Sequence, residues 1–225
     1  MVTSSPMVVL VGCLLGCVVG WGAWLAARSL AGPEPVSSAP APPPEAPLRG
    51  AISRPAVPAA AGMALWGTIV GWRSGRLDQT VLALLLTGLL LTLSLVDFRV
   101  RRIPNVVLLA LLGWGLGQML WLPEGPTVAA AALGLALAGG LFLVLSLFGR
   151  GALGAGDVKL AAVLGAILGY PAVLPALFGG AVAGGAAALW LLATHRIGRK
   201  DPMAYGPYLA LGAWAVWTLS LRLWS

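Results

Sequence analysis

Long apolar runs separated by short polar breaks extend over most of the chain, and this pattern predicts membrane-spanning helices. Most of the runs approach the roughly 20 residues that a helix needs to cross the hydrocarbon core of a bilayer. Eight helices are expected, over residues 7–27, 59–73, 79–97, 104–122, 127–148, 158–173, 172–194 and 205–223. The predicted fold class is therefore an all-α polytopic membrane protein with about eight transmembrane helices.

The composition supports the same class. Hydrophobic residues make up 59% of the chain and charged residues 9%, whereas soluble domains are about 45–50% apolar and about 25% charged. The net charge of +7 does not indicate nucleic-acid binding, because the basic residues fall in short loops between apolar runs. The expected surroundings of the protein are therefore a lipid bilayer, and no nucleic acid is expected as a partner.

The chain divides into three segments. Residues 1–29 are expected to form an uncleaved N-terminal transmembrane helix, because the apolar run lacks a basic segment before it and is longer than a signal peptide's apolar region of about 7–15 residues. Residues 30–58 are rich in proline and alanine, which predicts a flexible cytoplasmic linker. Residues 59–225 hold the remaining helices and form a membrane-embedded domain.

The distribution of lysine and arginine predicts the orientation. If the N-terminus lies outside and successive loops alternate sides, three of the 14 basic residues fall outside. The other eleven fall inside, namely Arg28, Arg49, Arg54, Arg99, Arg101, Arg102, Arg150, Lys159, Arg196, Arg199 and Lys200. Cytoplasmic loops are enriched in these residues, so the N-terminus is predicted to be outside.

Two acidic residues lie at the edges of strongly apolar segments in a chain with only seven carboxylate side chains. Asp97 ends one predicted helix and Asp157 precedes another, and the predicted topology places both at the cytoplasmic surface. An ionisable residue at a membrane boundary is costly to place and is therefore a functional candidate. A second interpretation remains open, in which each aspartate only caps a helix or pairs with a nearby basic residue.

A pair of aspartates suggests one chemistry in particular. Two carboxylates about 3 Å apart do not easily both ionise, so one activates water while the other keeps a proton that it can donate to a carbonyl oxygen. Gly154 and Gly156 precede the second aspartate, and their lack of a Cβ would let the backbone bend and a substrate strand approach closely.

Two stretches of sequence resemble the signature motifs of type IV prepilin peptidases, which are bacterial membrane aspartyl proteases of the Gly-x-Gly-Asp type. They are Asp97-Phe-Arg-Val-Arg-Arg-Ile-Pro-Asn105 and Gly154-Ala-Gly-Asp-Val-Lys-Leu160. The resemblance extends over roughly residues 62–225 and includes Tyr205-Gly-Pro-Tyr-Leu-Ala-Leu-Gly212, which is similar to the start of the family's last helix. It implies that residues 59–225 are a membrane-embedded aspartyl peptidase domain.

The resemblance also assigns roles to individual residues. It implies that Asp97 and Asp157 are the catalytic pair. Supporting positions around them are implied for Gly154, Gly156, Lys159, Pro104 and Asn105. A cation at Lys159 would favour an ionised carboxylate, although a lysine that only reaches the membrane surface fits equally well. The implied reaction is cleavage of the leader peptide of type IV prepilins or pseudopilins at the cytoplasmic face of the bacterial inner membrane.

The sequence also departs from the family pattern. Many members carry a four-cysteine zinc site between the first two helices and methylate the new N-terminus, but residues 30–58 contain no cysteine. Structural zinc is therefore not expected there, and the use of S-adenosylmethionine is in doubt. Cys13 and Cys17 are interpreted as packing residues of the first helix. No cofactor or metal site is predicted.

The sequence leaves two other classes of function open. A non-catalytic scaffold that binds prepilins would need no intact carboxylate pair. A small transporter would place its carboxylates near the bilayer midplane, whereas both candidate aspartates here are predicted at helix ends. Tyr205 and Tyr208 are compatible either with a place at the site or with an interfacial aromatic belt.

Overall fold

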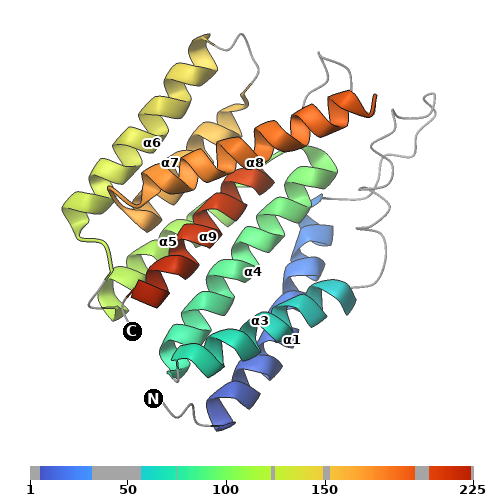
Figure 1. Cartoon of the computed structure of the whole chain (residues 1–225), viewed down its shortest axis with the longest axis vertical. Helices are drawn as coiled ribbons and strands as arrows, with labels where there is room; N and C mark the ends of the chain where they lie inside the picture. The colour runs from blue at the N-terminus through green and yellow to red at the C-terminus, as the bar shows by residue number, and fades with distance from the viewer. Residues whose placement is uncertain are drawn as a thin grey trace.

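The computed structural model describes residues 6–31, 57–74, 76–122, 125–148, 153–195 and 203–223. These segments form eight helices and contain no strand (Figure 1). The helices are α1 (Pro6–Ala31), α3 (Val57–Ser74), α4 (Leu77–Val100), α5 (Asn105–Trp121), α6 (Val128–Phe148), α7 (Ala155–Leu168), α8 (Val173–Ala193) and α9 (Gly206–Leu223).

The prediction of an all-α polytopic membrane protein is confirmed. Among the described helices, α1, α4, α6 and α8 are long and apolar enough to cross a membrane, and α5 is a shorter apolar helix. Their outer faces are apolar as well: Leu10, Leu14 and Val18 of α1 are 61%, 59% and 69% exposed. A soluble protein rarely shows such continuous apolar surface, whereas lipid accommodates it. The predicted outside location of the N-terminus stays a prediction.

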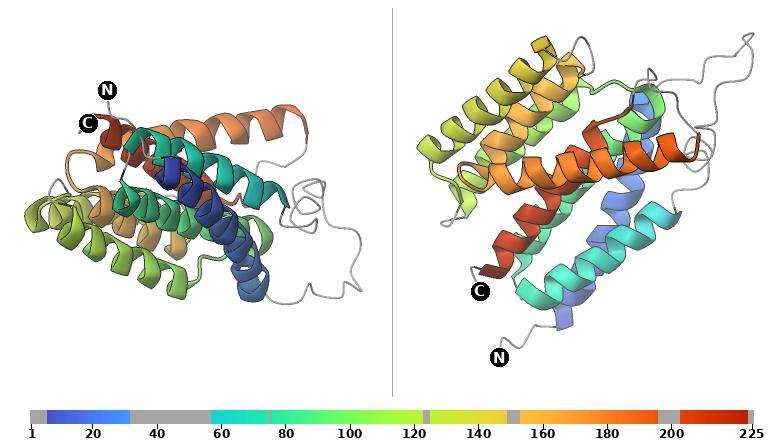
Figure 2. Two further views of the ribbon diagram at one scale, coloured as in Figure 1. Left: turned by 90° about the horizontal axis from the view of Figure 1, so that it is seen from below. Right: turned by 45° about the horizontal axis from the view of Figure 1, so that its top comes forward.

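Helices α4 and α9 form the centre of the bundle. Helices α1 and α3 pack on one side of α4, while α6 and α7 lie on the far side of α5 and α9 (Figures 1 and 2). Large buried side chains from four helices make up the shared core: Leu86, Leu93, Leu111, Leu160, Leu164, Ile167 and Leu209. This core fixes how the ends of α4, α7 and α9 lie relative to one another.

The first helix packs closely against the rest of the bundle. A Cβ at Gly12 or Gly16 of α1 would collide with the backbone of α3, at Gly67 and Met63 respectively. Small residues allow two helix backbones to approach in this way. The predicted linker, residues 30–58, lies almost entirely outside the described residues.

The bounds predicted for one helix were wrong at both ends. The expected helix over 158–173 is observed as α7, from Ala155 to Leu168. It ends there because Gly169 has φ +70°, a left-handed conformation that glycine adopts without strain. The following turn then donates the Tyr170 N–H to the carbonyl oxygen of Ala130 at 2.9 Å, which ties this hairpin to α6.

A buried glutamine ties three helices together. Gln118 of α5 is 1% exposed. Its amide nitrogen donates to the carbonyl oxygen of Ile167 in α7, and its amide oxygen accepts the Trp217 indole N–H of α9 at 3.1 Å. The Trp217 ring also packs edge-on against Trp114 at 5.4 Å. Gln118 therefore satisfies polar groups that lipid or core side chains would leave unpaired.

We predict that Gln118→Met destabilises the bundle. Methionine is of similar size, but it leaves the Trp217 N–H and the Ile167 carbonyl without a partner, which costs about 1–3 kcal/mol for a buried polar group. Thermal unfolding in detergent measures the effect. Leu116→Met is the control, because Leu116 lies on the same helix and is 63% exposed. Equal unfolding temperatures for the two variants would contradict the role of Gln118.

Candidate active site

Asp97 lies in the last turn of α4 and is 4% exposed. The helix ends at Arg101, whose φ of 52° and ψ of 39° are left-handed and whose N–H donates to the Asp97 carbonyl oxygen at 2.8 Å. This turn reverses the chain directly after Asp97 and leads into α5. The carboxyl group of Asp97 is thereby placed at the end of the bundle but beneath its surface.

Asp157 lies in the first turn of α7 and is half-buried. The predicted helix started at residue 158 and placed Asp157 before it. In the structure, Asp157 belongs to the helix. The Gly154 N–H donates to Asp157 Oδ2 at 3.2 Å. An acidic side chain in this position is stabilised by the free N–H groups and the dipole of the helix.

The two glycines before Asp157 lie at the start of α7. Gly154 has φ −76° and ψ 152°, which any residue adopts, so its backbone conformation does not require glycine, and the close approach of a substrate strand stays a prediction. A Cβ at Gly156 would lie 3.2 Å from Cβ of Ile103, so the small size of this residue matters for packing. Gly156 brings the start of α7 close to the segment that follows α4.

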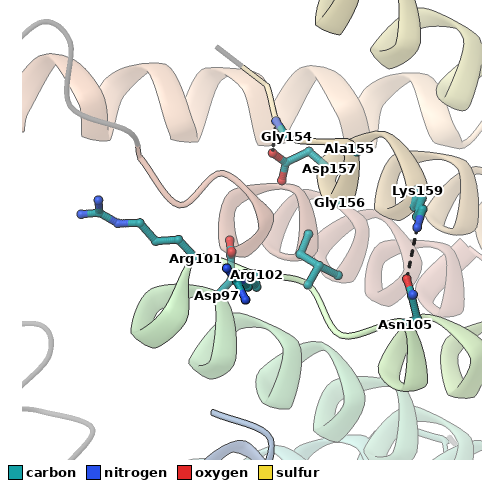
Figure 3. Close-up of a pocket in the computed structure, with 10 residues that line it drawn as sticks. Asp97, Arg101, Arg102, Asn105, Gly154, Ala155, Gly156, Asp157 and Lys159 are labelled. Atoms are coloured by element: carbon teal, nitrogen blue, oxygen red, sulfur yellow. Dashed lines mark hydrogen bonds between the residues drawn. The ribbon is translucent and has the colours of Figure 1, made fainter. Parts of the chain in front are cut away.

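Both aspartates line one cavity of about 390 Å³ at this end of the bundle. Figure 3 shows their carboxyl groups entering it from different helices, Asp97 from α4 and Asp157 from α7. The sequence-predicted residues Gly154, Gly156, Lys159 and Asn105 line the same cavity, together with Arg101, Arg102, Ile103 and Ala155. A cavity of this size has room for water and for a segment of peptide.

Lys159 contacts a side chain of the helix that follows Asp97. Its ammonium group donates to Asn105 Oδ1 at 3.3 Å, so it joins the start of α7 to the start of α5 (Figure 3). Pro104 is the N-cap of α5, and its carbonyl oxygen accepts the N–H groups of Val107 and Leu108. A proline fits here because its missing N–H removes no helical hydrogen bond.

The start of α9 also reaches the aspartates, through Gly206, to which the sequence assigned no role. The Gly206 N–H donates to Asp97 Oδ2 at 3.1 Å. The preceding residue, Tyr205, packs its ring 6.3 Å from that of Phe142. Burial raises the pKa of the Tyr205 hydroxyl, and the negative charge of nearby Asp157 raises it further. Two signals in the sequence pointed here: the similarity of residues 205–212 to the family's last helix, and the open interpretation of Tyr205 as a site residue.

The donor set of the cavity favours acid–base chemistry. It combines two carboxylates with the basic side chains of Arg101, Arg102 and Lys159. In the part of the chain that the structure describes, no three His, Cys, Asp or Glu residues gather as they would around a metal ion. The expectations about zinc and S-adenosylmethionine stay predictions. Two carboxylates at one cavity can divide the roles of base and acid between them.

The fold and the cavity together define a helical membrane protein with a two-aspartate site at one end of the bundle. Residues 84–189 match the model of the type IV leader peptidase family, and over this region the chain is similar to that family. The matched family is one of peptidases, as the sequence motifs implied.

Curated proteins named prepilin leader peptidase/N-methyltransferase are similar to this chain. The protein of Xanthomonas campestris is 35% identical over 150 residues, which cover 64% of this chain and 52% of the relative. The Pseudomonas putida protein is 33% identical over 159 residues, covering 68% and 54%. The Burkholderia pseudomallei protein is 41% identical over 136 residues, covering 56% and 42%. The chain thus spans about half the length of these relatives, and no solved structure matches it.

The environment of Tyr205 predicts an unusual titration. In a Tyr170→Phe, Tyr208→Phe background, which leaves one of the three tyrosines, we expect Tyr205 to ionise above the usual pKa of about 10. The Asp157→Asn variant removes a negative charge that opposes tyrosinate formation, so the pKa should fall toward the usual value. Ultraviolet absorbance during alkaline titration measures both.

Asp78→Asn provides the control for this titration, because Asp78 lies in the first turn of α4, at the opposite end of the helix from Asp97. It should leave the Tyr205 titration unchanged. A Tyr205 that ionises like free tyrosine, or one that does not respond to Asp157→Asn, would show that the two side chains are not neighbours.

Proposed function

We propose that the protein is a membrane aspartyl endopeptidase that cleaves the leader peptide of type IV prepilins or pseudopilins. One observation carries the proposal: the two aspartates supplied by the separate signature motifs line a single cavity. The family match supports the same reaction class. The names of the relatives support the substrate class, because they specify prepilin leader peptides.

In the proposed reaction, one aspartate is ionised and the other is protonated. The ionised carboxylate accepts a proton from a water molecule, whose oxygen adds to the carbonyl carbon of the scissile peptide bond. The protonated carboxyl donates to the carbonyl oxygen. Collapse of the tetrahedral intermediate then breaks the C–N bond as a proton passes to the leaving nitrogen.

The position of the cavity suits a substrate that is partly embedded in the bilayer. The cavity lies where α4 ends and where α5, α7 and α9 begin. A prepilin's apolar helix could remain in lipid while its basic leader extends to the aspartates. The basic side chains at this end, Arg101, Arg102 and Lys159, support a cytoplasmic location under the positive-inside rule.

The proposed activity is peptide cleavage alone. Water activation by a carboxylate pair requires neither zinc nor S-adenosylmethionine, so no step of the reaction involves either. The alternatives of a small transporter or a non-catalytic scaffold gain no specific support, since both acids lie at helix ends and face one cavity.

We predict that Asp97→Asn and Asp157→Asn each slow prepilin cleavage by at least about 100-fold, since loss of a general acid or base costs 10²–10⁴ in rate. Co-expression with a prepilin, followed by an assay of the purified protein in liposomes, measures this loss. Asp78→Asn is the matched control, because Asp78 lies roughly 28 Å from Asp97 along α4 and pairs with exposed Arg76. Processing at the parental rate by either site variant would refute the two-aspartate mechanism.

The proposed orientation has an independent test. In a Cys13→Ser, Cys17→Ser background, Arg102→Cys should resist a membrane-impermeant maleimide in intact cells and react in inverted vesicles. Arg76→Cys should show the opposite pattern, because it lies at the other end of α4. Labelling of Arg102→Cys from outside would place the cavity on the wrong face for a cytoplasmic leader.

A further inference from the structure

We infer that Gly206, the first residue of α9, is a positioning residue that holds the Asp97 carboxyl group in its working orientation. The contact between Gly206 and Asp97 is observed in the structure of the site. Its effect on catalysis rests on the proposed function. Gly206 lies 109 residues from Asp97 in the sequence, on a helix that the signature motifs do not include.

A buried hydrogen bond carries the inference. The Gly206 N–H donates to Asp97 Oδ2 at 3.1 Å, and Asp97 is 4% exposed. The first N–H groups of a helix have no partner within the helix and are free to bind other acceptors. The α9 amide therefore satisfies a carboxylate oxygen that water reaches poorly. It also restricts rotation of the carboxyl group about its last bond.

The space around Gly206 supports the same role. A Cβ at this position would lie 2.7 Å from Asp97 Oδ2, closer than a real Cβ approaches, while its contact with Ile103 Cδ1 would be an ordinary 3.4 Å. Gly206 does not adopt a positive φ, so its backbone does not require glycine. Position 206 requires glycine because there is no room for a side chain. The atom that occupies this room is Oδ2 of Asp97, the candidate catalytic carboxylate.

The amide is itself held firmly in place. Helices α8 and α9 pack backbone to backbone: a Cβ at Gly180 would meet the Tyr208 carbonyl oxygen at 3.0 Å and Leu209 Cα at 3.1 Å. The start of α9 therefore cannot easily shift to make room for a larger residue at position 206. A substitution there should instead displace the carboxyl group of Asp97.

A stability cycle tests the contact without reference to activity. We expect Gly206→Ala to lower the thermal unfolding midpoint by several degrees in the parent, and to have little effect when Asp97→Ala has vacated the space. Gly180→Ala is the control: its Cβ meets backbone atoms, so its effect should be equal in both backgrounds. Equal effects of Gly206→Ala in both backgrounds would overturn the inference.

The catalytic consequence is a change in kcat without a change in KM. A misplaced catalytic group costs about 100-fold in rate, so Gly206→Ala should lower kcat by about that factor and leave KM within about twofold. Gly179→Ala, whose Cβ would meet nothing within 4 Å, should keep both constants. An unchanged kcat, or a loss explained by KM, would overturn the role. Failure of the parent to cleave prepilins would instead reject the proposed function. The stability cycle would still show whether Gly206 contacts Asp97.

Discussion

The structure of the site depends on how one buried carboxylate is satisfied. Asp97 is 4% exposed at the end of an apolar helix, where an unpaired carboxylate would carry a large desolvation cost. The α9 amide supplies a hydrogen bond to it from across the bundle, and the cavity provides the remaining contact with water. The ends of α4 and α9 must therefore meet, and α7 brings Asp157 to the same place.

The two ends of the bundle differ in role: one holds helices together, and the other carries the cavity. At the end opposite the cavity, the turn after Gly169 is tied to α6 by a backbone hydrogen bond from Tyr170 to Ala130. Within the bundle, Gln118 links α5, α7 and α9 in a mainly apolar core. Rigid helices are well suited to hold two catalytic groups in fixed relative positions.

The helices and the two aspartates could be predicted because their signals are local. An apolar run long enough to span a bilayer is visible in the sequence, and so is an acid at its edge. The role of Gly206 could not be predicted, because its partner is 109 residues away. The Lys159–Asn105 contact is equally non-local. The start of α7 was misplaced because Asp157 was taken to precede the helix, although an acid is also favourable inside the first turn.

In the proposed mechanism, Asp97 and Asp157 act together on one water molecule. The decisive measurement is an experimental structure of the protein in lipid with an uncleaved prepilin leader bound. The expected result is a single water within roughly 3 Å of an oxygen from each carboxyl group, next to the scissile carbonyl. A bound leader whose scissile bond lies outside this cavity, or carboxyl groups too far apart to share one water, would contradict the two-aspartate mechanism.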